Sequence, residues 1–434
     1  MRLGGRLAAA IEVLDDIGRR HRPATDALKD WGLSHRFAGA GDRAAIGNIV
    51  YDALRRKRSA GWLLDGDTPR AIGFGALLLE WGETAKSLNE ALEGDRFAPE
   101  PLSEAEQQGI EERRKMAPPE TVAADCPDWA APLLQQVFGD NWVTEAGALA
   151  GRPPLDLRVN TLKASRDKVL AELKDTGAKA TAIAPLGIRI APIEGAGRHP
   201  NVQAEPSFQK GWFEVQDEGS QIVAELAQAK PGMQVLDFCA GAGGKTLALA
   251  AMMDNHGQLF ATDDDKRRLA PIHERLERSG ARNVQVRTPR GAKDALAGLE
   301  GRADLVLIDA PCTGTGAWRR NPDAKWRVRP GALDERLKDQ IEALDRAVPL
   351  VKTGGRIAYV TCSVLDEENG VQVRAFLARH AGFAIEPPAD VTNALGERAF
   401  LFRRAVLTSE EGLLMTPRRT DTDGFFVSVL RRIG

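Results

Sequence analysis

The stretch Val235–Leu–Asp–Phe–Cys–Ala–Gly–Ala–Gly–Gly–Lys–Thr246 decides the fold of this chain. It begins as an apolar strand, continues as a glycine-rich turn and enters a helix, which we expect to run to Met253. From about residue 214 onward, the sequence alternates expected strands and helices in the same manner. Near-continuous apolar strands separated by helices are typical of a parallel sheet that is buried between helices. The sequence therefore predicts an α/β fold for this half of the chain.

The pattern outside this stretch divides the 434 residues into three predicted domains. Residues 1–130 are predicted to form a helical domain, and the proline-rich, acidic residues 94–128 within it are predicted to form a linker or an irregular connection. Residues 131–213 are predicted to form a small α+β subdomain, and 214–434 the α/β domain. The expected strands of the α/β domain are 234–238, 258–262, 284–286, 304–308 and 356–360, followed by a hairpin near 425–430. Its expected helices are 216–229, 246–253, 265–278, 333–348 and 368–379. In the α+β subdomain we expect strands at 155–159, 180–183 and 188–190 and a helix at 165–176.

The glycine-rich turn fails two nucleotide-binding motifs. A P-loop requires glycine where Cys239 stands, and the dinucleotide fingerprint requires glycine where Thr246 stands. About twenty residues later, Asp263 follows the next expected strand, where an acid accepts hydrogen bonds from ribose hydroxyls. A ribose site without phosphate-binding features indicates S-adenosylmethionine as the ligand, and Asp237 lies where its sulfonium or ammonium group would sit. The alternative is a generic strand–helix turn beside a solvated acid.

Two cysteine motifs follow two expected strands, Asp309–Ala–Pro–Cys312 and Thr361–Cys–Ser363. The carboxyl ends of parallel strands face the ligand site, so both thiols are predicted at the same edge of the sheet. A thiolate that adds to C6 of a pyrimidine makes C5 nucleophilic towards a methyl donor. Asp309 is the candidate for relieving charge at N3 or O2 of the base. The spacing alone does not decide which thiol is the nucleophile.

The segment after Cys312 is rich in cations and tryptophans. Cations beside flat rings suit the phosphates and splayed bases of single-stranded RNA. From this segment we predict RNA contacts for Arg319, Arg320, Lys325 and Trp326. The alternative is an exposed arginine-rich loop whose tryptophans pack inward.

The formal net charge of −2 hides local asymmetry: residues 1–60 carry a net charge of +5, and residues 61–130 carry −9. This balance argues only against a protein that coats nucleic acid indiscriminately. The four cysteines form no CxxC pair, so no metal site is predicted. The sequence shows neither a signal-peptide core nor a membrane-length apolar run. We therefore expect a cytoplasmic monomer with reduced thiols and no membrane partner.

Residues 150–434 resemble the Nop/Sun family of RNA cytosine-C5 methyltransferases, and within it the bacterial branch that acts on small-subunit ribosomal RNA. The resemblance implies a Rossmann-like S-adenosylmethionine-dependent core and a small RNA-recognition-like subdomain. A match in patches also implies a NusB-like helical RNA-binding domain at residues 1–130. The matching motifs are Val215–Gln–Asp–Glu–Gly–Ser–Gln221, Leu236–Asp–Phe–Cys–Ala–Gly–Ala–Gly–Gly–Lys–Thr246, Asp309–Ala–Pro–Cys312 with Arg319–Arg–Asn–Pro–Asp323, Thr361–Cys–Ser363 with Glu367–Glu–Asn369, Asp423–Gly–Phe–Phe426 and, in the small subdomain, Arg158–Val–Asn–Thr161.

The resemblance also implies roles for single residues. Cys362 would be the nucleophile, Cys312 would assist release of the product, and Asp309 and Lys245 would complete the catalytic set. The residues that would hold the cofactor are Cys239, Ala240, Gly241, Ala242, Gly243, Gly244, Lys245, Asp263, Arg268 and Asp309. Arg158 and Asn160 would contact RNA.

The sequence departs from the family pattern at two places near the predicted cofactor site. Gly241–Ala242 stands where the family usually has Ala-Pro, and residues 286–290 read Val-Arg-Thr-Pro-Arg where an adenine-contacting Asp is usual. A second hypothesis is therefore an RNA-binding ribosome-assembly factor with a degenerate methyltransferase fold. A third is a methyltransferase that acts on transfer RNA or protein.

Overall fold

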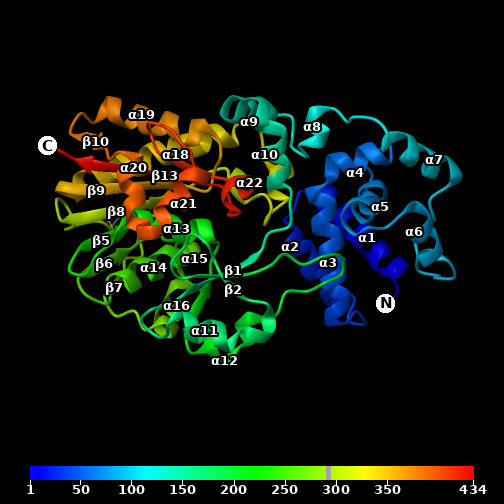
Figure 1. The fold of residues 1–434 in the computed structure, drawn as a ribbon, viewed down its shortest axis with the longest axis horizontal. Helices are drawn as coiled ribbons and strands as arrows, with labels where there is room; N and C mark the ends of the chain where they lie inside the picture. The colour runs from blue at the N-terminus through cyan, green and yellow to red at the C-terminus, as the bar shows by residue number, and fades with distance from the viewer. Residues whose placement is uncertain (290–294) are drawn as a thin grey trace. The chain divides into compact units, whose positions relative to one another are not determined.

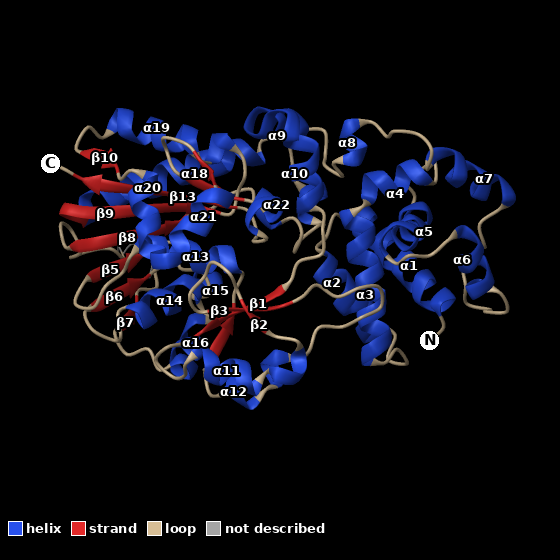
Figure 2. Ribbon diagram, viewed as in Figure 1, coloured by secondary structure: helices blue, strands red, loops and turns tan. Residues whose placement is uncertain are grey.

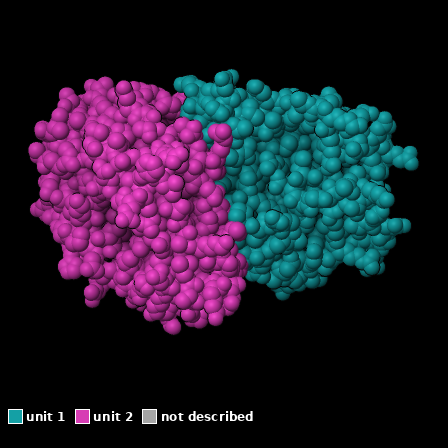
Figure 3. All heavy atoms as spheres, viewed as in Figure 1, with its two compact units in different colours: residues 1–153, 192–199, 318–329 teal, residues 154–191, 200–317, 330–434 magenta. Residues whose placement is uncertain are grey.

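The computed structural model describes residues 1–289 and 295–434, and the chain divides into two compact units (Figure 3). Unit 1 comprises residues 1–153, 192–199 and 318–329, and unit 2 comprises residues 154–191, 200–317 and 330–434. Two short segments from later in the sequence thus belong to the unit that contains the N-terminus. The domain boundaries at residues 130 and 213 stay a prediction.

All secondary-structure elements described for unit 1 are helices. Its longest helices pack on a core that includes the fully buried side chains of Leu7, Ile46, Ile49 and Leu77. No described helix is long and apolar enough to cross a membrane. The helices are α1 (Leu3–Arg20), α2 (Ala24–Ser34), α3 (Ala40–Arg55), α4 (Lys57–Leu63), α5 (Pro69–Glu80), α6 (Ala85–Leu92), α7 (Glu104–Arg113), α8 (Glu120–Ala123), α9 (Ala131–Phe138), α10 (Trp142–Leu149) and α17 (Ala324–Arg327).

The prediction of a linker over residues 94–128 is wrong, because this stretch contains helices α7 and α8. Helix α7 begins with a capping box: the Ser103 hydroxyl accepts from the Glu106 amide, and the Glu106 carboxylate accepts from the Ser103 amide. Only Ile110 of this helix is buried. A helix that is polar on nearly every face lacks the apolar period on which the prediction relied.

A small four-stranded antiparallel sheet in unit 2 confirms the predicted α+β subdomain. The strand order is β2-β3-β1-β4. The predicted strand 180–183 ends at Ala180, because the Thr181 hydroxyl donates to the Ala184 carbonyl and closes a turn. The elements are β1 (Leu155–Val159), α11 (Arg166–Glu172), β2 (Lys179–Ala180), β3 (Gly187–Ile190), α12 (Pro206–Gln209) and β4 (Phe213–Val215).

The large sheet of unit 2 confirms the predicted α/β core. Among the described residues the strand order is β11-β12-β13-β9-β8-β5-β6-β7, and β10 pairs with β13 (Figures 1 and 2). Strands β7, β6, β5, β8 and β9 pair in parallel, whereas β10 to β13 join through antiparallel pairs. The strands are β5 (Gln234–Asp237), β6 (Gln258–Ala261), β7 (Val284–Val286), β8 (Ala303–Asp309), β9 (Val351–Thr361), β10 (Phe383–Ile385), β11 (Leu407–Thr408), β12 (Leu413–Met415) and β13 (Phe425–Arg432).

Helices pack on this sheet as the alternation of elements predicts. Helix α14 packs on β6, and α18 packs on β8 and β9. The single helix expected at residues 265–278 is instead two helices, because Pro271 has no amide hydrogen to continue the ladder. The principal helices are α13 (Glu218–Ala227), α14 (Gly244–Met252), α15 (Lys266–Leu269), α16 (Ile272–Ser279), α18 (Ala332–Ala347), α19 (Gly370–Arg379), α20 (Pro388–Val391), α21 (Ala399–Ala405) and α22 (Pro417–Thr420).

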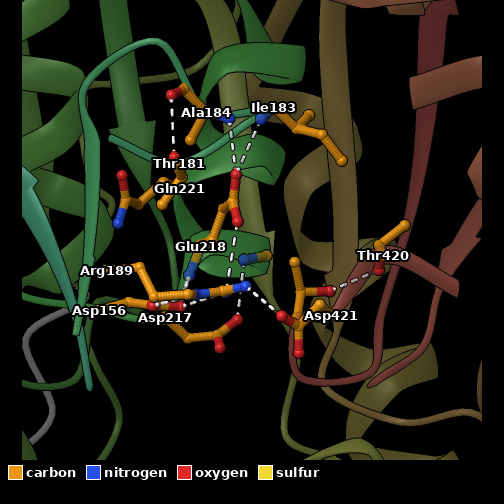
Figure 4. Close-up of polar contacts among 12 residues, drawn as sticks. Asp156, Thr181, Ile183, Ala184, Arg189, Asp217, Glu218, Gln221, Thr420 and Asp421 are labelled. Carbon is orange, nitrogen blue, oxygen red and sulfur yellow. Dashed lines mark hydrogen bonds and ion pairs between the residues drawn. The ribbon is translucent and has the colours of Figure 1, made fainter. Parts of the chain in front are cut away.

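Arg189 on β3 connects the small sheet to the rest of unit 2 (Figure 4). Its guanidinium forms a bidentate pair with the buried carboxylate of Asp156, at 2.7 and 2.8 Å. The same guanidinium pairs with Glu218 at the start of α13, at 3.2 Å, and with Asp421 before β13, at 2.7 Å. A planar guanidinium with several fixed donors suits this junction better than an ammonium. The small sheet is therefore bonded to the loop that leads into β13.

Candidate active site

The glycine-rich turn runs from the end of β5 to the start of α14. Gly243 caps α14 with a φ of 84°, a conformation that favours glycine. A Cβ at this position would lie 2.5 Å from Cγ1 of Ile272 on α16, so a side chain would collide there. Glycine at this position therefore lets the turn pack closely against α16.

Asp263 follows β6 and faces this turn. Its carboxylate accepts from the amides of Gly241 and Asp265, at 2.9 Å each, and the side chain is buried. Arg268 lies 3.7 Å from the same carboxylate and is more than half exposed. A pocket of about 220 Å³ is lined by Phe238, Cys239, Asp263, Asp264, Asp265, Arg268, Pro311, Arg336, Asp339, Glu342, Ala343 and Arg346.

These residues fit S-adenosylmethionine. The fully buried Asp237 accepts from the Thr246 hydroxyl with Oδ2, whereas its Oδ1 has no partner, which leaves one acceptor for a cationic ligand group. Burial raises the pKa of Asp237 to about 7. The acidic pocket supplies acceptors for hydroxyl groups. Burial also raises the pKa of the Cys239 thiol well above its usual value, which fits a wall position rather than a nucleophile.

The remaining predicted cofactor residues lie along the same turn. Ala240 is buried and donates its amide to the Thr262 carbonyl, and the Ala242 carbonyl accepts from Arg275. The departure at residues 286–290 is described only in part. The Arg287 carbonyl accepts from the Thr262 hydroxyl at 2.7 Å, and Arg290 lies outside the described residues.

Lys245 and Asp309 form an ion pair across the site. Nζ of Lys245 donates to Oδ2 of Asp309 at 2.6 Å and lies 5.1 Å from the centre of the Phe425 ring. Burial lowers the Lys245 pKa, but the charge of Asp309 and the hydrogen bond outweigh it, so the pKa is raised. Lys245 also interacts electrostatically with Cys362. The ammonium therefore remains charged beside a carboxylate and a thiol.

The two predicted thiols meet. Cys312 follows β8 and Cys362 follows β9, and because these strands are parallel neighbours their carboxyl ends lie together. The two Sγ atoms are 3.3 Å apart, within hydrogen-bond distance for sulfur. The bond to Cys362 and burial together raise the pKa of Cys312 well above its usual value. The Cys312 thiol therefore stays protonated.

Backbone hydrogen bonds near the thiols join three segments, the loops that contain Gly316, Cys362 and Gly424. The Gly316 amide donates to the Cys362 carbonyl at 2.9 Å, and the Gly424 amide donates to the Gly316 carbonyl at 2.8 Å. Phe425, which follows Gly424, carries the ring beside Lys245. Sequence reasoning missed these contributions. The one signal for them is the motif Asp423–Gly–Phe–Phe426, which contributed to the family resemblance without an expected role.

Arg158 on β1 and Asn160 directly after it, both predicted to contact RNA, form hydrogen bonds within unit 2. Nε of Arg158 donates to Gln216 at 2.6 Å, and the amide of Asn160 donates to the carbonyls of Gly211 and Ser279, at 2.8 Å each. Both side chains are buried. Arg158 and Asn160 thus contribute to the internal hydrogen bonding of unit 2, and their contact with RNA stays a prediction.

The segment 318–329 is anchored within unit 1 rather than displayed. Nζ of Lys325 donates to the carbonyls of Arg55 and Asp125, at 3.0 and 2.6 Å, and the Trp326 indole donates to the Leu54 carbonyl at 2.7 Å. Two of these carbonyls end helix α3, where cations and donors are favoured. Lys325 and Arg319 are buried, and their contact with RNA stays a prediction. Arg320 and Trp326 are half-buried.

The buried Lys325 predicts a pH-dependent stability. Burial lowers its pKa to about 7 from 10.5, so between these pH values the unfolded chain binds more protons than the folded chain. The free energy of unfolding therefore rises with pH in this window, by at most about 1.4 kcal/mol per pH unit from this group. Urea denaturation at pH 7, 8 and 9 should show a smaller rise for Lys325→Met than for wild type. The exposed Lys338→Met serves as the control, and equal slopes for Lys325→Met and wild type would contradict the assignment.

Comparison with protein-family models identifies two regions of the chain. Residues 224–431 match the model described as 16S rRNA methyltransferase RsmB/F, and residues 126–192 match the ferredoxin-like domain of RsmF/B-like methyltransferases. A relative from Synechocystis, named probable ribosomal RNA small subunit methyltransferase B, is 29% identical over 98% of both chains. The ribosomal RNA small subunit methyltransferase B of Shigella sonnei is 37% identical over 59% of this chain and 58% of its own length.

Among solved structures, the crystal structure of PH0851 covers 100% of both chains with a TM-score of 0.71 and 26% identity. This agreement extends the likeness beyond the sheet to the whole chain. S-adenosylmethionine is the methyl donor of such proteins, and the glycine-rich turn, Asp263 and the free acceptor of Asp237 fit it. Residues 126–192 and 224–431 thus match the two domains of the RsmB/F family of S-adenosylmethionine-dependent methyltransferases.

Proposed function

We propose that this protein methylates C5 of a cytosine in small-subunit ribosomal RNA through a covalent adduct with Cys362. The observation that carries the proposal is the thiol pair, with Sγ atoms 3.3 Å apart, at the ends of β8 and β9. Methylation of an amino nitrogen needs no thiol, whereas activation of a pyrimidine C5 needs a nucleophile at C6. The names of the related proteins support ribosomal RNA as the substrate.

Formation of the adduct requires a thiolate and a donor at the base. The raised pKa of Cys312 keeps its own thiol protonated, so Cys312 is the donor of the pair and Cys362 is the residue that would attack as a thiolate. The Lys245 ammonium favours this negative charge. As the Cys362 sulfur bonds to C6, the electrons of the C5–C6 bond move towards N3 and O2, where the Lys245–Asp309 pair supplies a proton or hydrogen bond. When bound, S-adenosylmethionine supplies an electrophilic methyl group to C5.

Release of the product reverses the addition. The C5 proton leaves to a base, the electron pair of the C5–H bond restores the C5–C6 double bond, and the Cys362–C6 bond breaks with its electron pair returning to sulfur. The Cys312 thiol, 3.3 Å from the leaving sulfur, donates a hydrogen bond that stabilises the departing thiolate. Cys312 thus acts in release rather than in attack.

Removal of the Cys312 thiol tests this assignment. Cys312→Ala should form the adduct but lose the hydrogen bond that favours elimination, so RNA-linked protein should accumulate at least about tenfold over wild type. Denaturing gel electrophoresis after incubation with RNA and S-adenosylmethionine measures the adduct. The double variant Cys312→Ala/Cys362→Ala is the control and should form none. An adduct that persists in this double variant would contradict the role of Cys362.

The substrate itself is tested in cells. Bisulfite sequencing of ribosomal RNA from a deletion strain should show loss of one or more 5-methylcytosines, and the gene should restore them. Loss of a methylated cytosine only from transfer RNA would overturn the ribosomal assignment. No loss in any RNA would favour an assembly factor.

A further inference from the structure

Glu368 holds the backbone on the C-terminal side of Cys312. It lies in a short 3₁₀ turn (Asp366–Glu368) after β9, and its side chain is fully buried. Oε1 accepts from the Thr313 amide at 2.7 Å, and Oε2 accepts from the Thr313 hydroxyl at 2.5 Å. Charge-assisted hydrogen bonds of this kind are short and strong.

Gln340 on α18 holds the backbone on the N-terminal side of Cys312. Its amide nitrogen donates to Oε1 of Glu368 at 3.1 Å and to the Pro311 carbonyl at 2.9 Å. Glu368 and Gln340 therefore fix both neighbours of Cys312.

Asn369, the next residue, holds Cys362 in the same way. Its Oδ1 accepts from the Thr361 hydroxyl at 2.5 Å, and its Nδ2 donates to the Ser363 carbonyl at 2.9 Å. The side chain of Asn369 is buried. Two consecutive residues thus hold the neighbours of the two thiols. The Tyr359 hydroxyl fixes this dipeptide on β9 by donating to the Glu368 carbonyl at 2.6 Å.

We propose that Glu368 and Asn369 are positioning residues that set the distance between the two thiols, Glu368 through Cys312 and Asn369 through Cys362. Neither side chain is placed in contact with the base or the cofactor. Because the thiols perform different steps, the two positioning residues affect different steps. This inference rests on the proposed function, which assigns attack to Cys362 and release to Cys312.

Variants of Asn369 and Glu368 should affect adduct formation and adduct resolution separately. Asn369→Ala frees the neighbours of Cys362, and a displacement of about 1 Å costs on the order of 100-fold in rate, so the adduct should form more slowly. Glu368→Ala should form the adduct at nearly the wild-type rate but resolve it about 10-fold to 100-fold more slowly. Quenched time courses on denaturing gels measure both rates.

The Cys312→Ala background sharpens this distinction. In this background Asn369→Ala should still slow the accumulation of adduct. Glu368→Ala should add nothing to the release defect, because the thiol it positions is absent. A further slowing of release by Glu368→Ala in this background would overturn the pairing of Glu368 with Cys312.

Glu368→Gln separates charge from geometry. The amide can still bond to Thr313, whose hydroxyl can turn to accept, but the negative charge is lost. The groups that act on the Cys312 thiol are Cys362, Glu368 and the Gly314 amide: the charge of Glu368 raises the pKa of Cys312, and the hydrogen bond from Gly314 lowers it. The buried Tyr359 lies near enough for Cys312 to raise the pKa of its hydroxyl. The pH profile of adduct resolution should therefore shift to lower pH in this variant. An unshifted profile would contradict an electrostatic role of Glu368.

Asp366→Asn is the matched control. It makes the same carboxylate-to-amide change in the same turn, but Asp366 pairs with Arg374 at 2.9 Å rather than with the thiol segments. It should keep wild-type rates for both steps. Circular dichroism and calorimetry with S-adenosylhomocysteine confirm that each variant is folded. If Cys312→Ala traps an adduct while the Glu368 and Asn369 variants behave as wild type, only the positioning inference fails. If no variant forms an adduct, the proposed function fails.

Discussion

Replacement of Cys362 by alanine is expected to lower methyl transfer to RNA by about 10⁴-fold or more, because no other group can form the bond to C6. Cys312 does not substitute: its pKa is raised and its thiol serves as the donor of the pair. Cofactor binding should stay unchanged, since the pocket is lined by residues from the turn, Asp263 and α18 rather than by Cys362. Transfer of a radiolabelled methyl group and calorimetry with S-adenosylmethionine measure the two properties.

Cys126→Ala is the matched control for this loss. Cys126 is a free, buried cysteine of unit 1 whose pKa is raised to about 11 by burial, so its thiol is inert. This variant should keep nearly full turnover. Retention of more than a tenth of the wild-type activity by Cys362→Ala would show that the reaction does not proceed through this thiol.

Local sequence patterns were sufficient to predict the core around the thiols. Strands β5 and β8 are apolar runs bounded by glycine, proline or aspartate, and parallel strands must end at one edge of a sheet. That rule alone predicted the proximity of Cys312 and Cys362, which the distance of 3.3 Å confirms. The assignment of nucleophile and donor came from the resemblance, because spacing carries no information about which thiol retains the proton.

Other features depended on contacts distant in sequence. Lys325 is of a residue type that often binds phosphate. Its acceptors are nevertheless the carbonyls of Arg55 and Asp125, which lie 270 and 200 residues away in the sequence. No local pattern reports that the end of α3 offers these acceptors. The same holds for Arg158 and Asn160, since their partners belong to other segments of unit 2. Polar residues that serve the scaffold and polar residues that serve RNA look alike until the partners are known.

The backbone contact between Gly316 and Gly424 leads to the second large expected effect on turnover. A Cβ on Gly316 would collide with the Gly424 carbonyl oxygen, and a Cβ on Gly424 would lie 2.6 Å from the Gly316 Cα. Both obstacles are backbone atoms, so no side-chain rotation relieves the clash. Gly316→Ala should therefore separate the two loops and break the hydrogen bond that Gly316 donates to the Cys362 carbonyl. Displacement of the nucleophile predicts a loss of turnover on the order of 100-fold, measured as transfer of a radiolabelled methyl group.

Gly314→Ala distinguishes this clash from backbone strain. Gly314 lies in the same loop with a φ of 72°, but a Cβ at this position would meet no atom within 4 Å, so alanine there adds strain of about 1 kcal/mol without a collision. It should lose only a few-fold in turnover. Cofactor affinity should be unchanged in both variants, because neither glycine lines the pocket. Equal turnover in Gly316→Ala and Gly314→Ala would mean that general loop strain, rather than the contact between Gly316 and Gly424, sets the position of Cys362.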